Sequence, residues 1–217
     1  MMRHSCYSII LILGICFQAS AKDNTVSAEV KTTGGIKADM AFLSFLTDNA
    51  PKAVSTYTPG ASVGGFACID FKDWVGLQPE FNLNYKRSSF AWESRGGMMT
   101  SMGIEIPIYV MFHINMFKSH RINIGVGPYT EFTYMARWEI DERKVDLLKI
   151  KNDGNPMIQD TQSGLGATLG YEFGNGIAIN IAYKVCCYNI LQPNSSQGVS
   201  LYPQTASIGI SYKFRKR

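Results

Sequence analysis

Cysteine and histidine are scarce in this sequence, and the scarcity limits the chemistry it can carry. The 217 residues include 5 cysteines and 3 histidines. Only Cys68, Cys186 and Cys187 lie beyond the N-terminal segment, and neither their number nor their spacing fits a disulfide framework or a metal site. Adjacent Cys186 and Cys187 would point to opposite faces of a strand, so one ion could not bind both. We therefore expect no metal and no cofactor.

The sequence also lacks a large excess of charge of one sign and long apolar helices. The net charge is +4, part of it lies in residues 215–217, and no basic stripe with interleaved aromatic residues is present. These features argue against a nucleic-acid partner. Hydrophobic residues make up 46% of the chain, too few for a bundle of membrane helices.

The first 21 residues have the pattern of a secretory signal peptide. A positive start precedes an apolar run at residues 6–17 (CYSIILILGICF), and Ala19-Ser20-Ala21 is a small-x-small cleavage site. The run is too short to span a bilayer. A lipoprotein signal is the alternative, because Cys16 lies at the end of the run. Ile15 argues against it, since the lipoprotein peptidase needs a small residue there.

Alternation of apolar and polar residues dominates the rest of the chain. In residues 76–86, GLQPEFNLNYK, every second residue is large and apolar, which predicts a β-strand with two unlike faces. Seven further segments have the same pattern. The eight predicted strands are residues 35–43, 62–71, 76–86, 101–114, 121–134, 163–173, 177–188 and 204–214.

The connections between these segments alternate in length. Short turns are predicted at residues 72–74, at 115–120 and at Gly174-Asn175-Gly176, whose Asn-Gly pair favours a hairpin. An even number of strands, with short turns at one end and long loops at the other, is typical of an outer-membrane barrel. The predicted long, polar loops are residues 44–60, 87–100, 137–161 and 189–203.

The apolar face could contact either a protein core or lipid. A soluble eight-stranded barrel or sandwich would turn this face inward, and a signal peptide would suit a secreted protein equally well. Three features favour lipid outside: glycines recur on the polar face, charges lie near its strand middles, and aromatic residues gather at strand ends. These aromatic residues are Phe71, Trp74, Phe173, Tyr212 and Phe214 toward the short turns and Tyr85, Tyr134, Trp138 and Tyr183 toward the long loops.

We therefore predict an all-β fold, an eight-stranded antiparallel up-and-down transmembrane β-barrel with both termini in the periplasm. Pro79, Pro107 and Pro128 lie within predicted strands, although a closed barrel has no edge for a missing N–H donor. We expect bulges there, or places where the ladder is already irregular. The predicted organisation is a signal peptide at residues 1–21, a periplasmic lead at 22–32, the barrel at 33–214 and a basic periplasmic tail at 215–217.

Ten charged residues are predicted to project into the lumen. An active site or an ion path is one interpretation of them. A salt-bridged plug is the interpretation we favour, because buried charges must be paired. Glu80 and Glu105, on neighbouring strands, would then need Lys86 or Lys37 as partners. The ten residues are Lys37, Asp39, Asp70, Glu80, Lys86, Glu105, Glu131, Glu172, Lys184 and Lys213.

No motif points to catalysis. Residues 164–170, GLGATLG, look like a nucleotide-binding loop, but a strand pattern follows where a helix would be needed. His113 and His120 lie toward the predicted periplasmic end, away from the outer rim where barrel hydrolases act. Without a nucleophile and base in one arrangement, we expect no enzyme activity.

A series of short motifs runs along the predicted strands. They are Gly35-Ile36-Lys37-Ala38, Leu77-Gln78-Pro79-Glu80, Glu105-Ile106-Pro107, Gly127-Pro128-Tyr129, Gly164-Leu165-Gly166, Tyr183 with Asn189-Ile190, and Gly209-Ile210-Ser211-Tyr212-Lys213-Phe214. In their order and spacing the chain resembles the PorT-like outer-membrane β-barrel family of the Bacteroidetes. The resemblance implies the barrel, the outer membrane and the prolines within strands. Cys186-Cys187 departs from it, since the family usually has Gly-Leu there, and Cys186 would crowd the lumen slightly.

These observations predict a non-enzymatic outer-membrane protein that acts as a surface-loop scaffold or interaction partner. The loop at residues 137–161 mixes charges of both signs with apolar residues, and several interpretations of it stay open. It either extends its strands as a hairpin, contacts a protein partner or a polysaccharide, or is a solvated loop with no partner. The resemblance alone implies an accessory role in protein secretion. A small passive channel is the alternative. We expect contact with outer-membrane lipid and lipopolysaccharide, no nucleic acid, and a monomer.

Overall fold

The computed structural model describes residues 30–49, 53–92, 95–117, 119–140, 143–149, 156–192 and 198–214. No helix in this part of the chain is long and apolar enough to cross a membrane. The predicted signal peptide and the tail at residues 215–217 lie outside the described residues. The strands found are β1 (Lys31–Asp48), β2 (Ala53–Lys72), β3 (Val75–Trp92), β4 (Arg95–Met116), β5 (His120–Ile140), β6 (Arg143–Asp146), β7 (Thr161–Glu172), β8 (Ile177–Cys186) and β9 (Ser200–Lys213).

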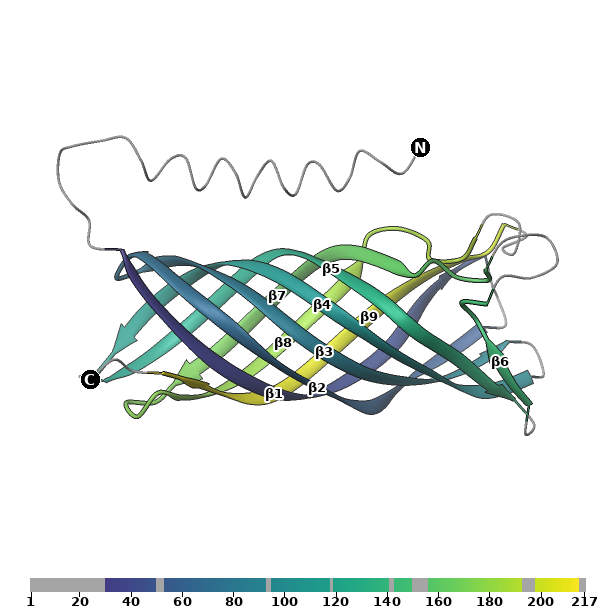
Figure 1. The fold of residues 1–217 in the computed structure, drawn as a ribbon, viewed down its shortest axis with the longest axis horizontal. Helices are drawn as coiled ribbons and strands as arrows, with labels where there is room; N and C mark the ends of the chain where they lie inside the picture. Colours follow the sequence, from purple (N-terminus) through teal and green to yellow (C-terminus); the bar gives the residue numbers. More distant parts are fainter. Residues whose placement is uncertain are drawn as a thin grey trace.

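Eight of the strands described close into one antiparallel barrel (Figure 1). The sheet order is β4-β3-β2-β1-β9-β8-β7-β5-β6, and β4 also pairs with β5. The first and last strands are neighbours, because β1 pairs with β9 from Gly35–Lys213 to Asp48–Ser200. The short strand β6 pairs with β5 and is not part of the ring. The predicted eight-stranded up-and-down barrel is confirmed.

The two ends of the barrel differ in their connections. At one end, the turn end, tight turns join β2 to β3, β4 to β5 and β7 to β8. Gly176 in the last of these turns has a φ of 89°, a conformation that favours glycine, and the predicted Asn-Gly turn is confirmed. β1 begins and β9 ends at the turn end, on the left of Figure 1. The opposite end, the loop end, carries β6 and the remaining connections.

The strands run farther toward the loop end than the sequence predicts. The predicted loops at residues 44–60 and 87–100 are wrong, because β1 continues to Asp48, β2 starts at Ala53, and β3 and β4 are separated by residues 93–94 alone. β4 has 22 residues, whereas about 9–11 suffice to cross the hydrocarbon core. The alternation continues in these segments, but here the apolar residues face the inside of the barrel. Because the two faces are exchanged, the sequence analysis did not recognise these segments as strands.

The exterior of the barrel changes character along the strands. From the turn end as far as Tyr85 on β3 and Tyr134 on β5, the exposed outward side chains are apolar, as Phe81 (51%) and Ile124 (42%) illustrate. Beyond Tyr85 the next outward residue is Arg87. Inside the barrel the order is opposite: the inward side chains are charged toward the turn end and apolar toward the loop end. An apolar outer band bordered by aromatic residues is the surface that a bilayer requires.

A β-bulge in β5 reverses which of its side chains face inward. The pairing of β4 with β5 skips Tyr134, so that Thr133 before the bulge and Ala136 after it are both buried inside. Trp138 follows on the same side as Ala136 and packs edge-on against Phe90, with 5.9 Å between the ring centroids. The predicted place of Trp138 in the exterior aromatic girdle is therefore wrong.

The three prolines that the sequence analysis placed within strands lie beside interruptions in the ladders rather than in bulges. Pro79 pairs with Ile108 on β4, but the ladder from β3 to β2 is interrupted beside it. Pro107 and Pro128 also pair on one side and lack a partner on the other. The register is the same before and after each interruption. Of the two predicted alternatives, the irregular ladder is confirmed and the bulge is wrong.

Glycine on the inner face makes room for large side chains that cross the lumen. A Cβ atom on Gly166 would lie 2.8 Å from Cγ of Lys184 and 3.2 Å from the hydroxyl of Tyr109. Tyr109 is 1% exposed and fills the barrel at this level. The lumen is thus packed around the missing side chain, as expected for a narrow eight-stranded barrel.

Gly166 and its neighbour Ala167 test this packing as a matched pair, since Ala167 is exposed on the outer face. Gly166→Val should lower the free energy of unfolding by about 1–3 kcal/mol, because the added atoms overlap Lys184 and Tyr109. Ala167→Val should change it by less than about 0.5 kcal/mol. Urea unfolding of the barrel in lipid vesicles measures both. Equal stability of the two variants would contradict the packed lumen.

Candidate functional site

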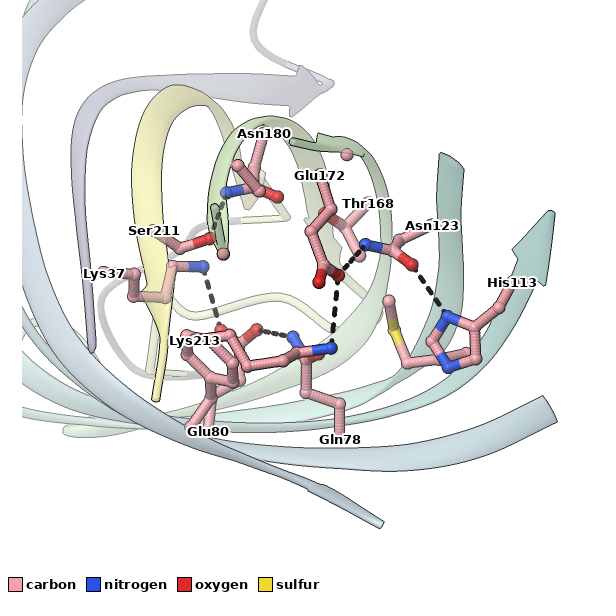
Figure 2. A pocket seen from close by; sticks show the side chains of 15 residues that line it. Lys37, Gln78, Glu80, His113, Asn123, Thr168, Glu172, Asn180, Ser211 and Lys213 are labelled. Carbon is pink, nitrogen blue, oxygen red and sulfur yellow. Dashed lines mark hydrogen bonds and ion pairs between the residues drawn. The ribbon is translucent and has the colours of Figure 1, made fainter. Parts of the chain in front are cut away.

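All ten predicted lumen charges project into the barrel and form ion pairs. Their side chains are at most 14% exposed. Three groups of paired residues can be distinguished along the barrel axis, and Figure 2 shows several residues of the two groups nearer the turn end. Because an unpaired charge at this depth would be strongly unfavourable, the pairing explains how so many ionisable residues are tolerated.

The group nearest the loop end is centred on Glu105 of β4, whose side chain is fully buried. Lys184 of β8 reaches across the lumen and donates a hydrogen bond to Glu105. Lys86 of β3 lies 3.4 Å from the other carboxylate oxygen and donates a 2.6 Å hydrogen bond to Glu131 of β5. Two lysines and two carboxylates from four strands thus tie opposite walls of the barrel together.

The middle group is centred on Glu80. Lys37 of β1 lies 3.0 Å from Glu80 and 3.3 Å from Asp39. The amides of Gln78 and Asn82 donate further hydrogen bonds to Glu80, at 2.8 and 3.1 Å. The predicted pairing is confirmed: Lys37 is the partner of Glu80, and Lys86 is a partner of Glu105.

The group at the turn end is a chain of hydrogen bonds that includes residues for which the sequence predicted no role. His113 lies 3.1 Å from Asp70 through Nε2 and 2.7 Å from Asn123 through Nδ1. The amide of Asn123 donates to Glu172, which also accepts from Lys213 at 3.2 Å. The alternation already placed His113 and Asn123 on the inner face, but nothing in the sequence showed that they join Asp70 to Glu172.

Arg121 is the charged lumen residue that the sequence analysis missed. Its guanidinium lies 3.6 Å from Asp70, on the side opposite His113, and it donates to Asn115. It is the second residue of β5, directly after the turn, and the sequence analysis did not assign its side chain to the inner face. Arg121 adds a fixed positive charge to an end of the lumen that is otherwise rich in carboxylates.

The two histidines among the described residues, His113 and His120, are not arranged for catalysis. Both ring nitrogens of His113 already contact Asp70 and Asn123, so neither is free to activate a nucleophile. His120 lies at the start of β5 and contacts the hydroxyl of Tyr171 at 3.1 Å. In the part of the chain that the structure describes, no three His, Cys, Asp or Glu side chains form a metal-binding group.

The lumen contains separate small cavities. A polar cavity of about 30 Å³ lies between the middle and turn-end groups (Figure 2). It has room for about two water molecules, since one needs about 10–15 Å³. A cavity of about 10 Å³ adjoins Lys86 and Glu131, and one of about 70 Å³ lies at the loop end. Tyr109 and the group around Glu105 fill the barrel between the first cavity and the others.

Above the charged groups, an apolar plug closes the loop end. We use this name for the buried cluster of inward strand residues and loop residues that pack together here. Backbone hydrogen bonds hold the loop residues in the plug. The N–H of Leu147 donates to the carbonyl oxygen of Ala136 at 2.9 Å, and the N–H of Ile190 donates to that of Leu201 at 3.0 Å. The sequence analysis assigned these segments to polar loops and missed the plug. Its members are Leu43, Phe45, Phe90, Met99, Ala136, Leu147, Ile158, Cys186, Ile190 and Leu201.

The three cysteines in the part of the chain that the structure describes form no disulfide with one another. Cys68 and Cys186 are buried and Cys187 is exposed, which confirms that the adjacent pair points to opposite faces. The sequence led us to expect that Cys186 would crowd the lumen slightly, but it lies away from the charged groups. It packs in the apolar plug, where its thiol contacts the carbonyl oxygens of Ser163 and Tyr188 at 3.4 Å.

Fold and lumen together define a membrane β-barrel with an apolar exterior and a packed interior. The chain belongs to the family of proteins with an outer membrane protein beta-barrel domain, whose model matches residues 18–186. The protein is therefore an integral protein of the bacterial outer membrane. No curated protein matches the chain in sequence.

Several solved structures are similar in fold. Neisserial surface protein A has 14% identity and a TM-score of 0.46, with 85% of this chain and 99% of that chain covered. Ail of Yersinia pestis has 14% identity and a TM-score of 0.44, with the same coverage of both chains. OprG of Pseudomonas aeruginosa has 13% identity and a TM-score of 0.49, with 85% of this chain and 97% of that chain covered. At this identity the likeness concerns the fold alone.

Glu105 and Glu139 test the importance of the lumen pairs. Glu105→Gln leaves Lys86 and Lys184 in the lumen with less compensation, and should lower the free energy of unfolding by about 3–5 kcal/mol. Glu139, which pairs with Lys144 at 3.4 Å, is 52% exposed, so Glu139→Gln should cost less than about 1 kcal/mol. Urea unfolding in lipid vesicles compares the two. Equal losses would show that the lumen pairs do not hold the barrel together.

Proposed function

We propose that this protein is a non-enzymatic, non-conducting scaffold that presents its loop end to a protein partner. The observation that carries the proposal is the filled lumen: three groups of paired charges and an apolar plug occupy the barrel from one end to the other. A barrel filled in this way offers little passage to solutes. The surfaces left for a specific role are then those that project from its ends.

In this proposal the turn end faces the periplasm and the loop end faces outward. Outer-membrane barrels have short periplasmic turns and longer extracellular loops, and the tight turns of this barrel gather at one end. The apolar exterior supports the same orientation. It ends at Tyr85 and Tyr134, well before the loop ends of β3 and β5, so the strands would extend beyond the bilayer on the outer side.

The hairpin formed by the end of β5 and β6 is the best candidate for the presented surface. Arg137 pairs with Asp146, and Glu139 with Lys144, so charges of both signs lie side by side. Glu139 and Lys144 are 52% and 64% exposed, whereas Trp138, which precedes Glu139 on β5, packs inward against the plug. The hairpin is therefore anchored from below and leaves its charges free for a partner.

A role as an accessory of protein secretion is the more specific form of the proposal. Its support is the resemblance to PorT-like barrels in motifs such as Leu77-Gln78-Pro79-Glu80. The partner would then be an exported protein or a component of the export machinery. Contact through paired surface charges favours a partner with a matching pattern of both signs and makes association sensitive to salt.

Two charge swaps test this proposal in a strain that lacks the gene. Glu139→Lys with Lys144→Glu keeps the ion pair of the hairpin but reverses the charges presented to a partner. Lys31→Asp with Asp73→Lys does the same to an exposed pair at the turn end, where the side chains are 61% and 84% exposed. The secreted and surface proteomes are compared for the deletion strain and for strains that carry each variant or the unchanged protein.

Loss of a set of exported proteins in the deletion strain and in the hairpin swap, with normal export in the turn-end swap, is the expected result. An unchanged proteome in the deletion strain would overturn the role in secretion. Full activity of the hairpin swap would overturn the hairpin as the contact. Both swap variants should keep the electrophoretic mobility of the folded barrel, because each preserves its ion pair.

A further inference from the structure

The outer face of β3, β4 and β5 consists of rows of side chains that follow from the register of the strands. Residues that pair directly across neighbouring strands lie on the same face of the sheet. The last row of the apolar band consists of Leu83, Ile104 and Phe132. The next row toward the loop end, at the border of the band, consists of Tyr85, Met102 and Met135.

A row that carries two positive charges follows directly beyond this border. Arg87 of β3 pairs with Thr100 of β4, and Thr100 pairs with Arg137 of β5. Arg87 lies two residues beyond Tyr85, or about 7 Å along the strand. Arg137 is exposed and Arg87 is half-buried. From the turn end outward, the face of these strands is thus apolar, then aromatic, then cationic, the order in which a leaflet offers hydrocarbon, interface and phosphate.

The part of the chain that the structure describes does not neutralise these two arginines. None of the ion pairs between described residues includes Arg87 or Arg137. The two acidic residues beside Arg137 have other partners. Glu139 pairs with Lys144 at 3.4 Å, and Asp146 accepts a 3.0 Å hydrogen bond from a backbone N–H. Both arginines can therefore bind an anion from outside the chain.

The arginine row belongs to one side of the barrel. On the opposite side, in the described loop-end halves of β8, β9 and β1, the one basic residue is Lys184, which points inward to Glu105. There the hydroxyl of Tyr183 donates a hydrogen bond to Gln204, which pairs with Ser44. The positive charge is thus a local feature and not a belt around the barrel.

We propose that Arg87 and Arg137 bind a phosphate group of a lipid in the outer leaflet, the phosphorylated sugar headgroup of lipopolysaccharide. This inference rests on the orientation given under the proposed function, in which the loop end faces outward. The acyl chains of the lipid lie against the apolar band, and the headgroup lies against the arginine row. Glu139 and Lys144, which the proposed protein contact uses, are not part of this site.

The chemistry of two arginines suits a phosphate monoester. A guanidinium group donates two parallel hydrogen bonds to phosphate oxygens. Arg87 and Arg137 are two strands apart, about 10 Å, so they can approach one phosphate from both sides, with the hydroxyl of Thr100 between them. A phosphate monoester carries a charge of about −1.5 to −2 at neutral pH, which two arginines match. The phosphodiester of a phospholipid carries a single negative charge and is matched less well.

The test is a titration of the full barrel in nonionic detergent with lipid A, the phosphorylated and acylated part of lipopolysaccharide, followed by native mass spectrometry. Dephosphorylated lipid A and phosphatidylglycerol are the comparison lipids. We expect both to bind about tenfold more weakly than lipid A. Equal binding of lipid A and its dephosphorylated form would overturn the site, and equal binding of phosphatidylglycerol would overturn the assignment to a phosphate monoester.

Two double variants with the same net charge locate the site. Arg87→Gln with Arg137→Gln should weaken binding of lipid A about tenfold. Lys31→Gln with Lys72→Gln removes two exposed positive charges at the turn end and should change it less than about twofold. Equal binding by the two variants would overturn the arginine site. The comparison of lipids on the unchanged barrel decides the proposal even if a variant fails to fold. Because purified components are used, failure here would leave the proposed role in secretion untouched.

Discussion

Pairing of the lumen charges is the constraint on which the rest of this barrel depends. Glu105 has no exposure to solvent and is held by Lys86 and Lys184 from two other strands. In water these ion pairs would contribute little, but at this depth leaving one charge unpaired costs several kcal/mol. Pairs such as Lys184–Glu105 therefore fix the distance between strands that are far apart in the sequence. Closure of the lumen is a direct consequence, because the side chains that pair also fill the space between the walls.

A second constraint acts along the strands, where lipid outside gives way to water. Up to Tyr85 and Tyr134 the barrel is apolar outside and polar inside, as a bilayer requires. Farther out, Phe45 and Phe90 turn inward into an apolar plug, as in a water-soluble protein. The bulge at Tyr134 makes this reversal on β5 by changing the side to which Trp138 points. One chain thus carries a membrane barrel and, beyond it, a small conventional core.

The parts of the fold that the sequence predicted are those where alternation is strict. Residues 76–86 showed both faces of β3, and the same pattern placed all ten charges in the lumen, because one strand residue in two must face inward. The strand ends at the loop end were not predictable in this way. Phe90 and Met99 alternate with serine, threonine and glycine, a composition that also suits loops. The plug was missed because Leu147, Ile158 and Ile190 come from irregular segments whose burial depends on contacts distant in sequence.

The central claim is that the barrel is closed, and its conductance in a planar lipid bilayer tests this claim most directly. Purified barrel inserted in known amount should give no steady single-channel current, because the paired charges and the plug separate the cavities of the lumen. Steady current would contradict this account, above all if Glu80→Gln or Lys86→Met changed its size or ion selectivity. Such a result would show that ions move past the side chains that we describe as a plug, and the protein would then be a channel.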